Sequence, residues 1–132
     1  MAEYAGYARL LIVDDEADVR VTTRRILKRG GYEVFEADSA ADAIAKAAGL
    51  QRPADLVIIN TQDMPGPEVL RRLREIWPRV PAILSHDGEA APNVSIAEGD
   101  PPVHFIPKPL RPEALPPLVD QIVPRPSRRP RP

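Results

Sequence analysis

Apolar residues along the chain fall into short runs that are typical of β-strands. Leu10–Val13 and Leu56–Ile59 are continuous apolar runs, the pattern of strands buried on both faces of a sheet. Residues 32–37 alternate in polarity, and residues 80–84 and 103–106 form two further short apolar stretches. The pattern therefore predicts five strands, with the first beginning at residue 8.

Helical periodicity fills the intervals between these strands. Apolar residues recur three and four positions apart in residues 17–29, 40–49, 67–77 and 112–122. Residues 89–102 have only a weak helical pattern, so any helix there is expected to be short or frayed. Two consecutive prolines early in the last helical segment predict a kinked or 3₁₀ first turn. Strands alternating with four or five helices predict an α/β fold with a parallel, doubly wound sheet.

Composition sets the broad class of protein. The chain has 132 residues, enough for one domain with a core, and it is 43% hydrophobic and 28% charged. The absence of cysteine excludes disulfides and thiolate metal sites. No apolar stretch approaches the ~20 residues of a membrane span. Because residues 1–7 also lack the layout of a signal peptide, we expect a cytoplasmic protein.

The two ends of the chain differ in character from the body. We expect residues 1–7 to be a loose lead-in, residues 8–123 the folded domain, and residues 124–132 a disordered tail of arginine and proline. The net charge of the whole chain is −1. Because the tail is rich in arginine, the rest of the chain is mildly acidic. A basic tail without aromatic residues binds nucleic acid only weakly. We therefore expect no nucleic-acid or membrane partner, and a monomer or weak homodimer.

Polar residues follow the predicted strands at the point where each strand ends. The carboxyl ends of parallel strands meet at one edge of the sheet, so these side chains are expected to converge. The residues concerned are Asp14, Asp15, Asn60, Ser85 and Lys108. Two carboxylates suit Mg²⁺, and the ammonium and hydroxyl groups suit a phosphate. The alternative for the acidic pair is a solvated loop at the start of the next helix.

Several short motifs, taken together, resemble the receiver domains of two-component response regulators. The resemblance covers residues 8–123 and depends on the order and spacing of the motifs, because each is weak alone. Residues 111–115 further resemble the start of the last helix in receivers at the C-termini of hybrid histidine kinases. The matching motifs are Leu11–Glu16, Asp55–Ile59, Met64–Gly66, Leu84–Ser85 and Phe105–Leu110.

The resemblance implies a flavodoxin-like fold with strand order 2-1-3-4-5 and a function in phosphorelay signalling. It implies that Asp14 and Asp15 form a Mg²⁺ pocket and that Ser85 is the hydroxyl that senses the phosphoryl group. Lys108 would be the cation over the site, and Phe105 the aromatic switch residue. The implied partner is a histidine kinase or a downstream signalling protein.

The chain departs from the family at the phosphoacceptor, where the expected aspartate is Asn60. A carboxylate oxygen can attack phosphorus, whereas a carboxamide of the same shape is neutral and a poor nucleophile. The amide can still bind a metal weakly and accept a hydrogen bond from Lys108. We therefore predict a pseudo-receiver without enzymatic activity, in which the Mg²⁺ site is weak or lost.

Two alternatives concern the loop after Asn60. The Met64–Pro65 pair follows Asn60 by one residue more than in the family, so a shifted register would put Thr61 at the acceptor position. Asp63 is a possible substitute acceptor, which would make the chain a working Mg²⁺-dependent phosphoacceptor. A more distant alternative is a small phosphohydrolase, because paired aspartates also occur in such enzymes.

Other polar and aromatic residues have simpler interpretations. We expect His86 and His104 to lie at the surface or partly buried, since nothing suggests that they share a metal. Trp77 is expected to cover the core near a helix end. The arginines of the third helical segment are expected to form a solvated face; they are Arg71, Arg72 and Arg74.

Overall fold

The structure of the chain is a computed structural model. The structure describes residues 8–62, 64–87 and 99–123. The predicted lead-in and tail, residues 89–98 of the weak helical segment and the substitute acceptor Asp63 lie outside these ranges. No described helix combines the length and the apolar character needed to span a bilayer.

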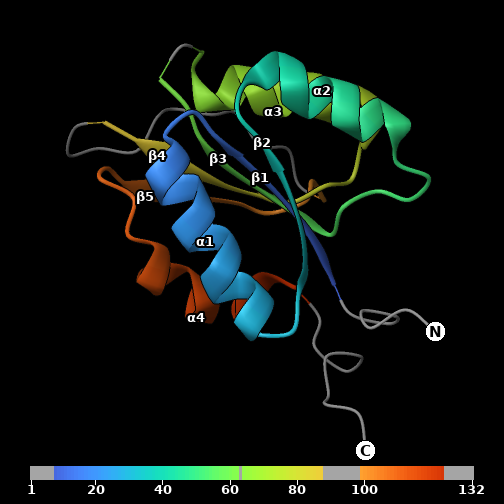
Figure 1. Cartoon of the computed structure of the whole chain (residues 1–132). Coiled ribbons are helices and arrows are strands. Elements are labelled where there is room, and N and C mark those ends of the chain that lie inside the picture. The colour runs from blue at the N-terminus through green and yellow to red at the C-terminus, as the bar shows by residue number, and fades with distance from the viewer. Residues whose placement is uncertain (1–7, 63, 88–98, 124–132) are drawn as a thin grey trace, which may run out of the picture.

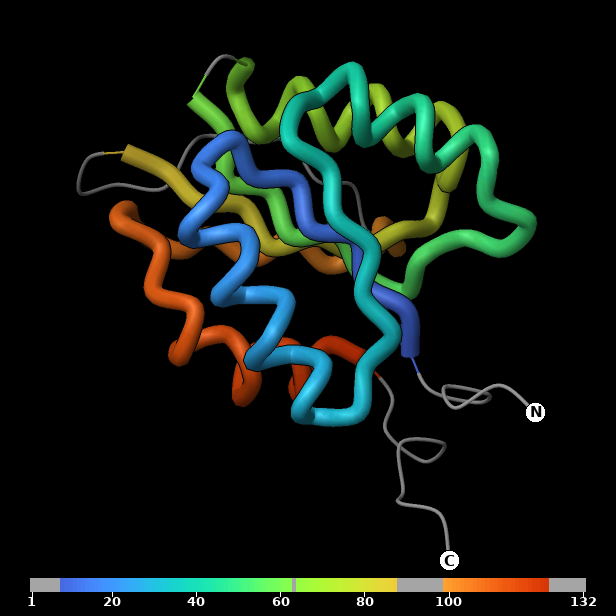
Figure 2. The backbone as a smooth tube through the Cα atoms, in the orientation of Figure 1, coloured from blue at the N-terminus to red at the C-terminus, as the bar shows by residue number. Residues whose placement is uncertain are grey.

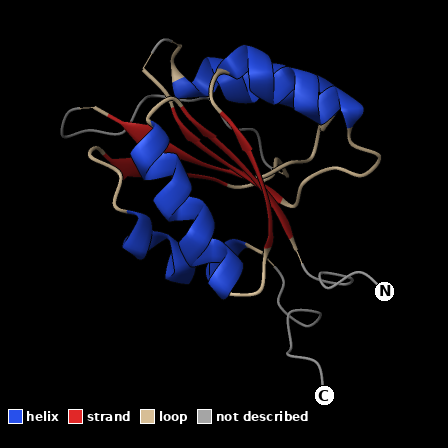
Figure 3. Ribbon diagram, viewed as in Figure 1, coloured by secondary structure: helices blue, strands red, loops and turns tan. Residues whose placement is uncertain are grey.

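Five parallel strands form a single sheet at the centre of the domain (Figure 1, Figure 3). Their order is β2-β1-β3-β4-β5, so β1 and β3 are flanked on both sides while β2 and β5 lie at the edges. The strands are β1 Arg9–Asp14, β2 Glu33–Ala37, β3 Leu56–Asn60, β4 Ala82–His86 and β5 Val103–Pro107. The predicted architecture and strand order are confirmed.

Helices cover both faces of the sheet, as the tube view also shows (Figure 2). Helices α2 and α3 lie together on one face, and α1 and α4 lie on the other (Figure 1). A 3₁₀ turn, η1 Pro112–Ala114, leads directly into α4 and confirms the turn predicted from the paired prolines. The helices are α1 Ala17–Arg29, α2 Ala40–Gly49, α3 Gly66–Ile76 and α4 Leu115–Ile122.

Two hydrophobic cores form because the central strands are buried on both faces. Along β1, Leu11 and Val13 pack toward α2 and α3, whereas Leu10 and Ile12 pack toward α1 and α4. This alternation is the two-residue period of a strand. Trp77 is only 4% exposed and belongs to the first core, so it is a core residue and not merely a cover over it.

Local sequence explains where two of the helices begin and end. Ser39 caps α2 by accepting a hydrogen bond from the backbone N–H of Asp42 at 3.1 Å. Helix α1 ends at the glycine pair: Gly30 stays in the right-handed region and Gly31 takes a φ of 95°. Glycine is favoured at such a positive φ because it has no Cβ to clash with the backbone.

The prediction of a solvated arginine face is right for two of its three members. Arg71 and Arg72 are exposed and pair with Glu68 on the same helix. Arg74 is partly buried: its guanidinium donates to the carbonyls of Val80 and Pro101, and burial lowers its pKa. Arg74 therefore joins the end of α3 to the segment that enters β5.

Replacing Ser39 with alanine should destabilise the domain by about 1 kcal/mol, because the first turn of α2 loses its side-chain acceptor. Replacement with glycine should have an effect of only a few tenths of a kcal/mol, since glycine is tolerated at this position. Urea unfolding followed by circular dichroism measures both changes. Equal stability of the alanine variant and the unsubstituted protein would contradict the assigned cap.

Candidate functional site

The carboxyl ends of β1, β3, β4 and β5 bring the predicted polar residues to one edge of the sheet. The register pairs Asp14 of β1 with Asn60 of β3, while Ser85 of β4 pairs with Ile106 two residues before Lys108. Asp14, Asn60 and Ser85 are 0%, 5% and 9% exposed. Strand pairing alone therefore brings these backbone positions together at one edge of the sheet.

The Asn60 carboxamide is the centre of a buried hydrogen-bond chain. Its Nδ2 donates to Oδ2 of Asp14 at 3.1 Å, and its Oδ1 accepts from Oγ of Ser85 at 2.5 Å. An amide can make both contacts because it carries a donor and an acceptor, whereas an ionised carboxylate only accepts. The geometry therefore links three of the five predicted residues through the amide that replaces the expected carboxylate.

The same contacts decide between the two registers at the acceptor position. Thr61 does not enter the cluster: its hydroxyl donates to the Met64 carbonyl at 2.6 Å and holds the loop after β3. The geometry therefore favours Asn60 over Thr61 as the residue that faces Asp14 at the end of β3.

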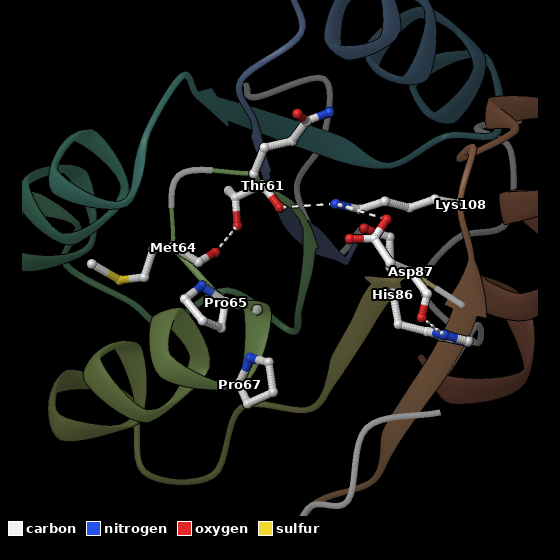
Figure 4. Close-up of a pocket in the computed structure, with 10 residues that line it drawn as sticks. Thr61, Met64, Pro65, Pro67, His86, Asp87 and Lys108 are labelled. Atoms are coloured by element: carbon white, nitrogen blue, oxygen red, sulfur yellow. Dashed lines mark hydrogen bonds and ion pairs between the residues drawn. The ribbon is translucent and has the colours of Figure 1, made fainter. Parts of the chain in front are cut away.

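Lys108 lies near the cluster, but the hydrogen bond expected from it to Asn60 is not formed. Its Nζ donates instead to the Thr61 carbonyl at 3.1 Å and lies 3.9 Å from the carboxylate of Asp87 (Figure 4). The Asn60 oxygen accepts from Ser85 instead. The Lys108–Pro109 peptide bond is cis.

The two aspartates differ in environment. Burial raises the pKa of Asp14 above its ordinary value of 3.8, although hydrogen bonds from the Glu16 backbone and the Asn60 amide oppose the rise. Asp15 is partly exposed and accepts from the Gln62 backbone N–H at 2.7 Å. Asp15 therefore holds the loop after β3, whereas Asp14 belongs to the buried cluster.

The residues present fit a Mg²⁺ ion poorly. Both oxygens of Asp14 accept hydrogen bonds, from the Glu16 backbone and from Asn60, and the Asn60 oxygen accepts from Ser85. Mg²⁺ needs several oxygen ligands in near-octahedral geometry. Within the described ranges, no three His, Asp or Glu side chains are grouped as a metal ion would require.

His86 is a residue of the site that the sequence interpretation placed wrongly. It was expected at the surface or partly buried, but it is 9% exposed and lies at the end of β4. Its ring meets the half-buried Phe105 edge-on, with centroids 6.3 Å apart. The position of His86 directly after Ser85 was the one feature of the sequence that could have indicated its place in the site. His104 is partly buried, as expected.

Fold and site together define a doubly wound α/β protein with a polar cleft at the carboxyl edge of its sheet. Residues 10–120 match the family model described as the response regulator receiver domain. The chain belongs to this family. The resemblance stated from the motifs is thereby confirmed.

Several curated proteins are similar to the chain. The transcriptional regulatory protein ResD of Bacillus subtilis is 38% identical over 89 residues, which are 65% of this chain and 36% of ResD. The sensor kinase CckA of Brucella abortus is 31% identical over 110 residues, 82% of this chain and 12% of the kinase. The chain thus spans little more than a third of one relative and about an eighth of the other.

Solved structures agree with the fold. The receiver domain of the hybrid histidine kinase CckA is 30% identical, with a TM-score of 0.68 over 86% of this chain and 97% of that one. The chemotaxis protein CheY4 of Vibrio cholerae is 26% identical, with a TM-score of 0.69 over 89% and 99% of the two chains. Both likenesses support a receiver domain in two-component signalling.

Replacing Ser85 with alanine should reduce the free energy of unfolding by about 1–3 kcal/mol, because the buried Asn60 oxygen loses its donor. A double-mutant cycle with Asn60→Ala isolates the interaction between the two side chains. Chemical denaturation of the four proteins gives the coupling energy. Additive effects of the two substitutions would contradict the hydrogen bond.

The raised pKa of Asp14 predicts a pH dependence of stability. Between 3.8 and the higher pKa of the folded state, the folded chain binds more protons at Asp14 than the unfolded chain. The stability contributed by this group is therefore fully present below 3.8 and is lost as the pH rises through the folded-state pKa. The stability of the unsubstituted protein relative to Asp14→Asn should fall over this interval, as urea unfolding at a series of pH values would measure. A difference independent of pH would contradict the raised pKa.

Proposed function

We propose that this chain is an atypical receiver domain that acts in two-component signalling without being phosphorylated. The observation that carries the proposal is the Asn60 carboxamide, hydrogen-bonded to both Asp14 and Ser85 at the place of the acceptor. A neutral amide oxygen is a poor nucleophile toward phosphorus. The domain then works as an interaction module and not as an enzyme.

The hydrogen-bond chain also supports a single, permanent conformation of the site. In a phosphorylated receiver the hydroxyl at the Ser85 position would bind the phosphoryl group, as the family resemblance implies. Here Asn60 accepts that hydroxyl at 2.5 Å. Ser85 is thus satisfied inside the protein, so no phosphoryl group is needed to hold it.

The proposal also includes a low affinity of the site for Mg²⁺. With Asn60 in place of a carboxylate, the site carries one negative charge fewer, and the oxygens of Asp14 are engaged by N–H donors. Fewer anionic ligands lower the affinity for a hard cation. We therefore propose that Mg²⁺ binds weakly, through Asp15 and with little effect on structure.

The partner proposed for the domain is a protein. Its relatives include a sensor kinase and a sporulation initiation phosphotransferase. A histidine kinase or a downstream signalling protein is the partner that these relatives support. We further propose that the protein is cytoplasmic and that it is a monomer or a weak homodimer.

Incubation with acetyl phosphate and Mg²⁺, followed by intact-mass measurement, tests the proposal. We expect no adduct on the unsubstituted protein, because no aspartate stands at the end of β3. The Asn60→Asp variant restores the carboxylate and should gain the mass of one phosphoryl group. Binding of beryllofluoride, followed by NMR, should likewise be saturable only in this variant.

The control is the Asp63→Asn variant, because Asp63 is the alternative acceptor. A phosphoryl adduct on the unsubstituted protein that disappears in this variant would show a working phosphoacceptor and contradict the proposal. An adduct that survives the substitution would contradict it equally. Failure of Asn60→Asp to accept phosphate would show that more than the amide separates this site from an active one.

A further inference from the structure

A cavity of about 270 Å³ lies at the end of the sheet opposite the polar cluster. It is lined by residues 53–55, which lead into β3, and by residues 76–81, which lead from α3 into β4. Because β3 and β4 are neighbours in the sheet, these two connections meet where the strands begin (Figure 2). The proposed function does not involve this end of the domain.

The lining of the cavity is largely apolar and rigid. Three of its residues are prolines, whose rings restrict the backbone, and the largest apolar side chains are those of Ile76 and Trp77. Trp77 is 4% exposed and is fixed in place by the core. The cavity is smaller than the about 300–1,000 Å³ of sites for drug-sized ligands, so it suits one or two side chains of a peptide. Aromatic-lined hollows of this kind accept proline-rich segments.

Two charged residues border the cavity, and one of them can receive a cation. The guanidinium of Arg79 is engaged, because it donates to the Gly99 carbonyl at 2.9 Å. Asp55 is exposed, and one of its oxygens accepts the backbone N–H of Arg9 at 2.7 Å. An ionised carboxylate accepts several hydrogen bonds, so Asp55 can also bind an arginine. The lining therefore suits a peptide of proline and arginine.

This chain contains such a peptide directly after its last helix. The tail, residues 124–132, consists of four prolines, four arginines and one serine. It lies outside the described residues, but the residue before it is well placed. Val123 is 2% exposed and belongs to the same core as Ala8 and Leu56, where β1 and β3 begin. The tail therefore leaves the domain at the end of the sheet that carries the cavity.

The tail is long enough to reach the cavity. A polyproline II segment advances about 3.1 Å per residue, so nine residues span about 28 Å. The path crosses the strand starts from the α4 side to the α3 side, and neighbouring strands lie only about 4.8 Å apart. A short attached segment has an effective concentration in the millimolar range, so a site with a millimolar Kd would already be about half occupied.

We propose that the tail folds back on its own domain and binds in this cavity, with prolyl rings against Trp77 and the proline walls and an arginine on Asp55. Composition alone predicted a disordered tail, and the proposal replaces that expectation for the part that the cavity holds. The bound tail would also block the cavity against proline-rich segments of other proteins. The contact does not depend on Asn60 or on phosphoryl chemistry.

A nitroxide spin label on the tail tests the proposal in the full chain. The chain has no cysteine, so Ser127→Cys creates a single labelling site, and its one tryptophan gives a single indole signal. We expect the label to reduce the intensity of the Trp77 indole N–H signal by about half or more, as an occupied site requires. Signals of Asp15 and Lys108, at the opposite end of the sheet, should be unaffected. The backbone amides that should lose intensity are those of residues 54, 55, 79 and 80.

Variants of the spin-labelled chain separate the prolyl contact from the ionic one. Replacing both Pro130 and Pro132 with glycine should remove most of the intensity loss, because glycine lacks the preformed polyproline II shape. Asp55→Asn keeps an oxygen for the Arg9 N–H but loses the charge, and it should lower the docking equilibrium about two- to fivefold. Asp38→Asn removes an exposed acid at the other end of the sheet, and as the matched control it should have no effect. Reduction of the nitroxide gives the reference intensities, and a dispersed spectrum establishes that each variant is folded.

Four outcomes would overturn the proposal. The first two are an unchanged Trp77 indole signal and a loss of intensity spread evenly over both ends of the domain. The third is an equal effect of Asp55→Asn and Asp38→Asn, and the fourth is an intensity loss that survives the replacement of both prolines. A ¹⁵N-labelled chain mixed with a spin-labelled second copy should keep its intensities, because the proposed contact lies within one molecule. Loss of the indole signal in that mixture would also contradict the proposal.

Discussion

The parallel pairing of β1 with β3 is the constraint on which the site depends. Both strands are buried on both faces, and the pairing places Asp14 directly beside Asn60. A shift of one residue would turn every side chain of a strand to the other face. Because Leu11 and Ile12 belong to different cores, such a shift would misplace apolar residues on both sides. Core packing therefore determines which residue stands beside Asp14 at the end of β3.

Given this placement, the chemical identity of residue 60 determines how the buried polar groups are satisfied. The carboxyl of Asp14 is fully buried, and burial of a charge is unfavourable without partners. The Asn60 amide supplies a donor to it at 3.1 Å and an acceptor to Ser85. An ionised aspartate in this place would offer no donor and would repel Asp14. The amide thus stabilises an arrangement that a carboxylate could reach only with a cation between the two acids or with one of them protonated.

The fold, and the cluster of Asp14, Asn60 and Ser85 at one edge of the sheet, could be predicted from the sequence. Continuous apolar runs of four residues locate β1 and β3, and the position after the second run identifies Asn60 as the strand-end residue. The bounds of β4 were less accurate, because the apolar stretch 80–84 was used, whereas pairing with β5 carries the strand to His86. This two-residue displacement is why His86 was expected at the surface. Apolar patterns mark what is buried by hydrophobicity, but they do not mark polar residues buried by strand pairing.

Side-chain partners were the part of the site that the sequence could not determine. Lys108 was expected to donate to Asn60, and Arg74 was expected in solvent. Long cationic side chains reach many acceptors from one backbone position, so their partners depend on which acceptors are still free in three dimensions. Arg74 finds the carbonyls of Val80 and Pro101 because the α3–β4 connection and the start of β5 meet there. The spacing of residues along the chain does not predict that these two segments lie together.

The position of Lys108 follows from the loss of charge at residue 60. An ammonium and a carboxylate about 4 Å apart attract by about 4 kcal/mol at an effective dielectric constant of about 20. A hydrogen bond to a neutral amide contributes only about 1 kcal/mol net. Without a carboxylate at residue 60, the ammonium would gain little energy by turning toward the cluster, and it donates to the Thr61 carbonyl. Under the proposed function, the amide at residue 60 therefore stands in place of the nucleophile, and Lys108 is held by the Thr61 carbonyl.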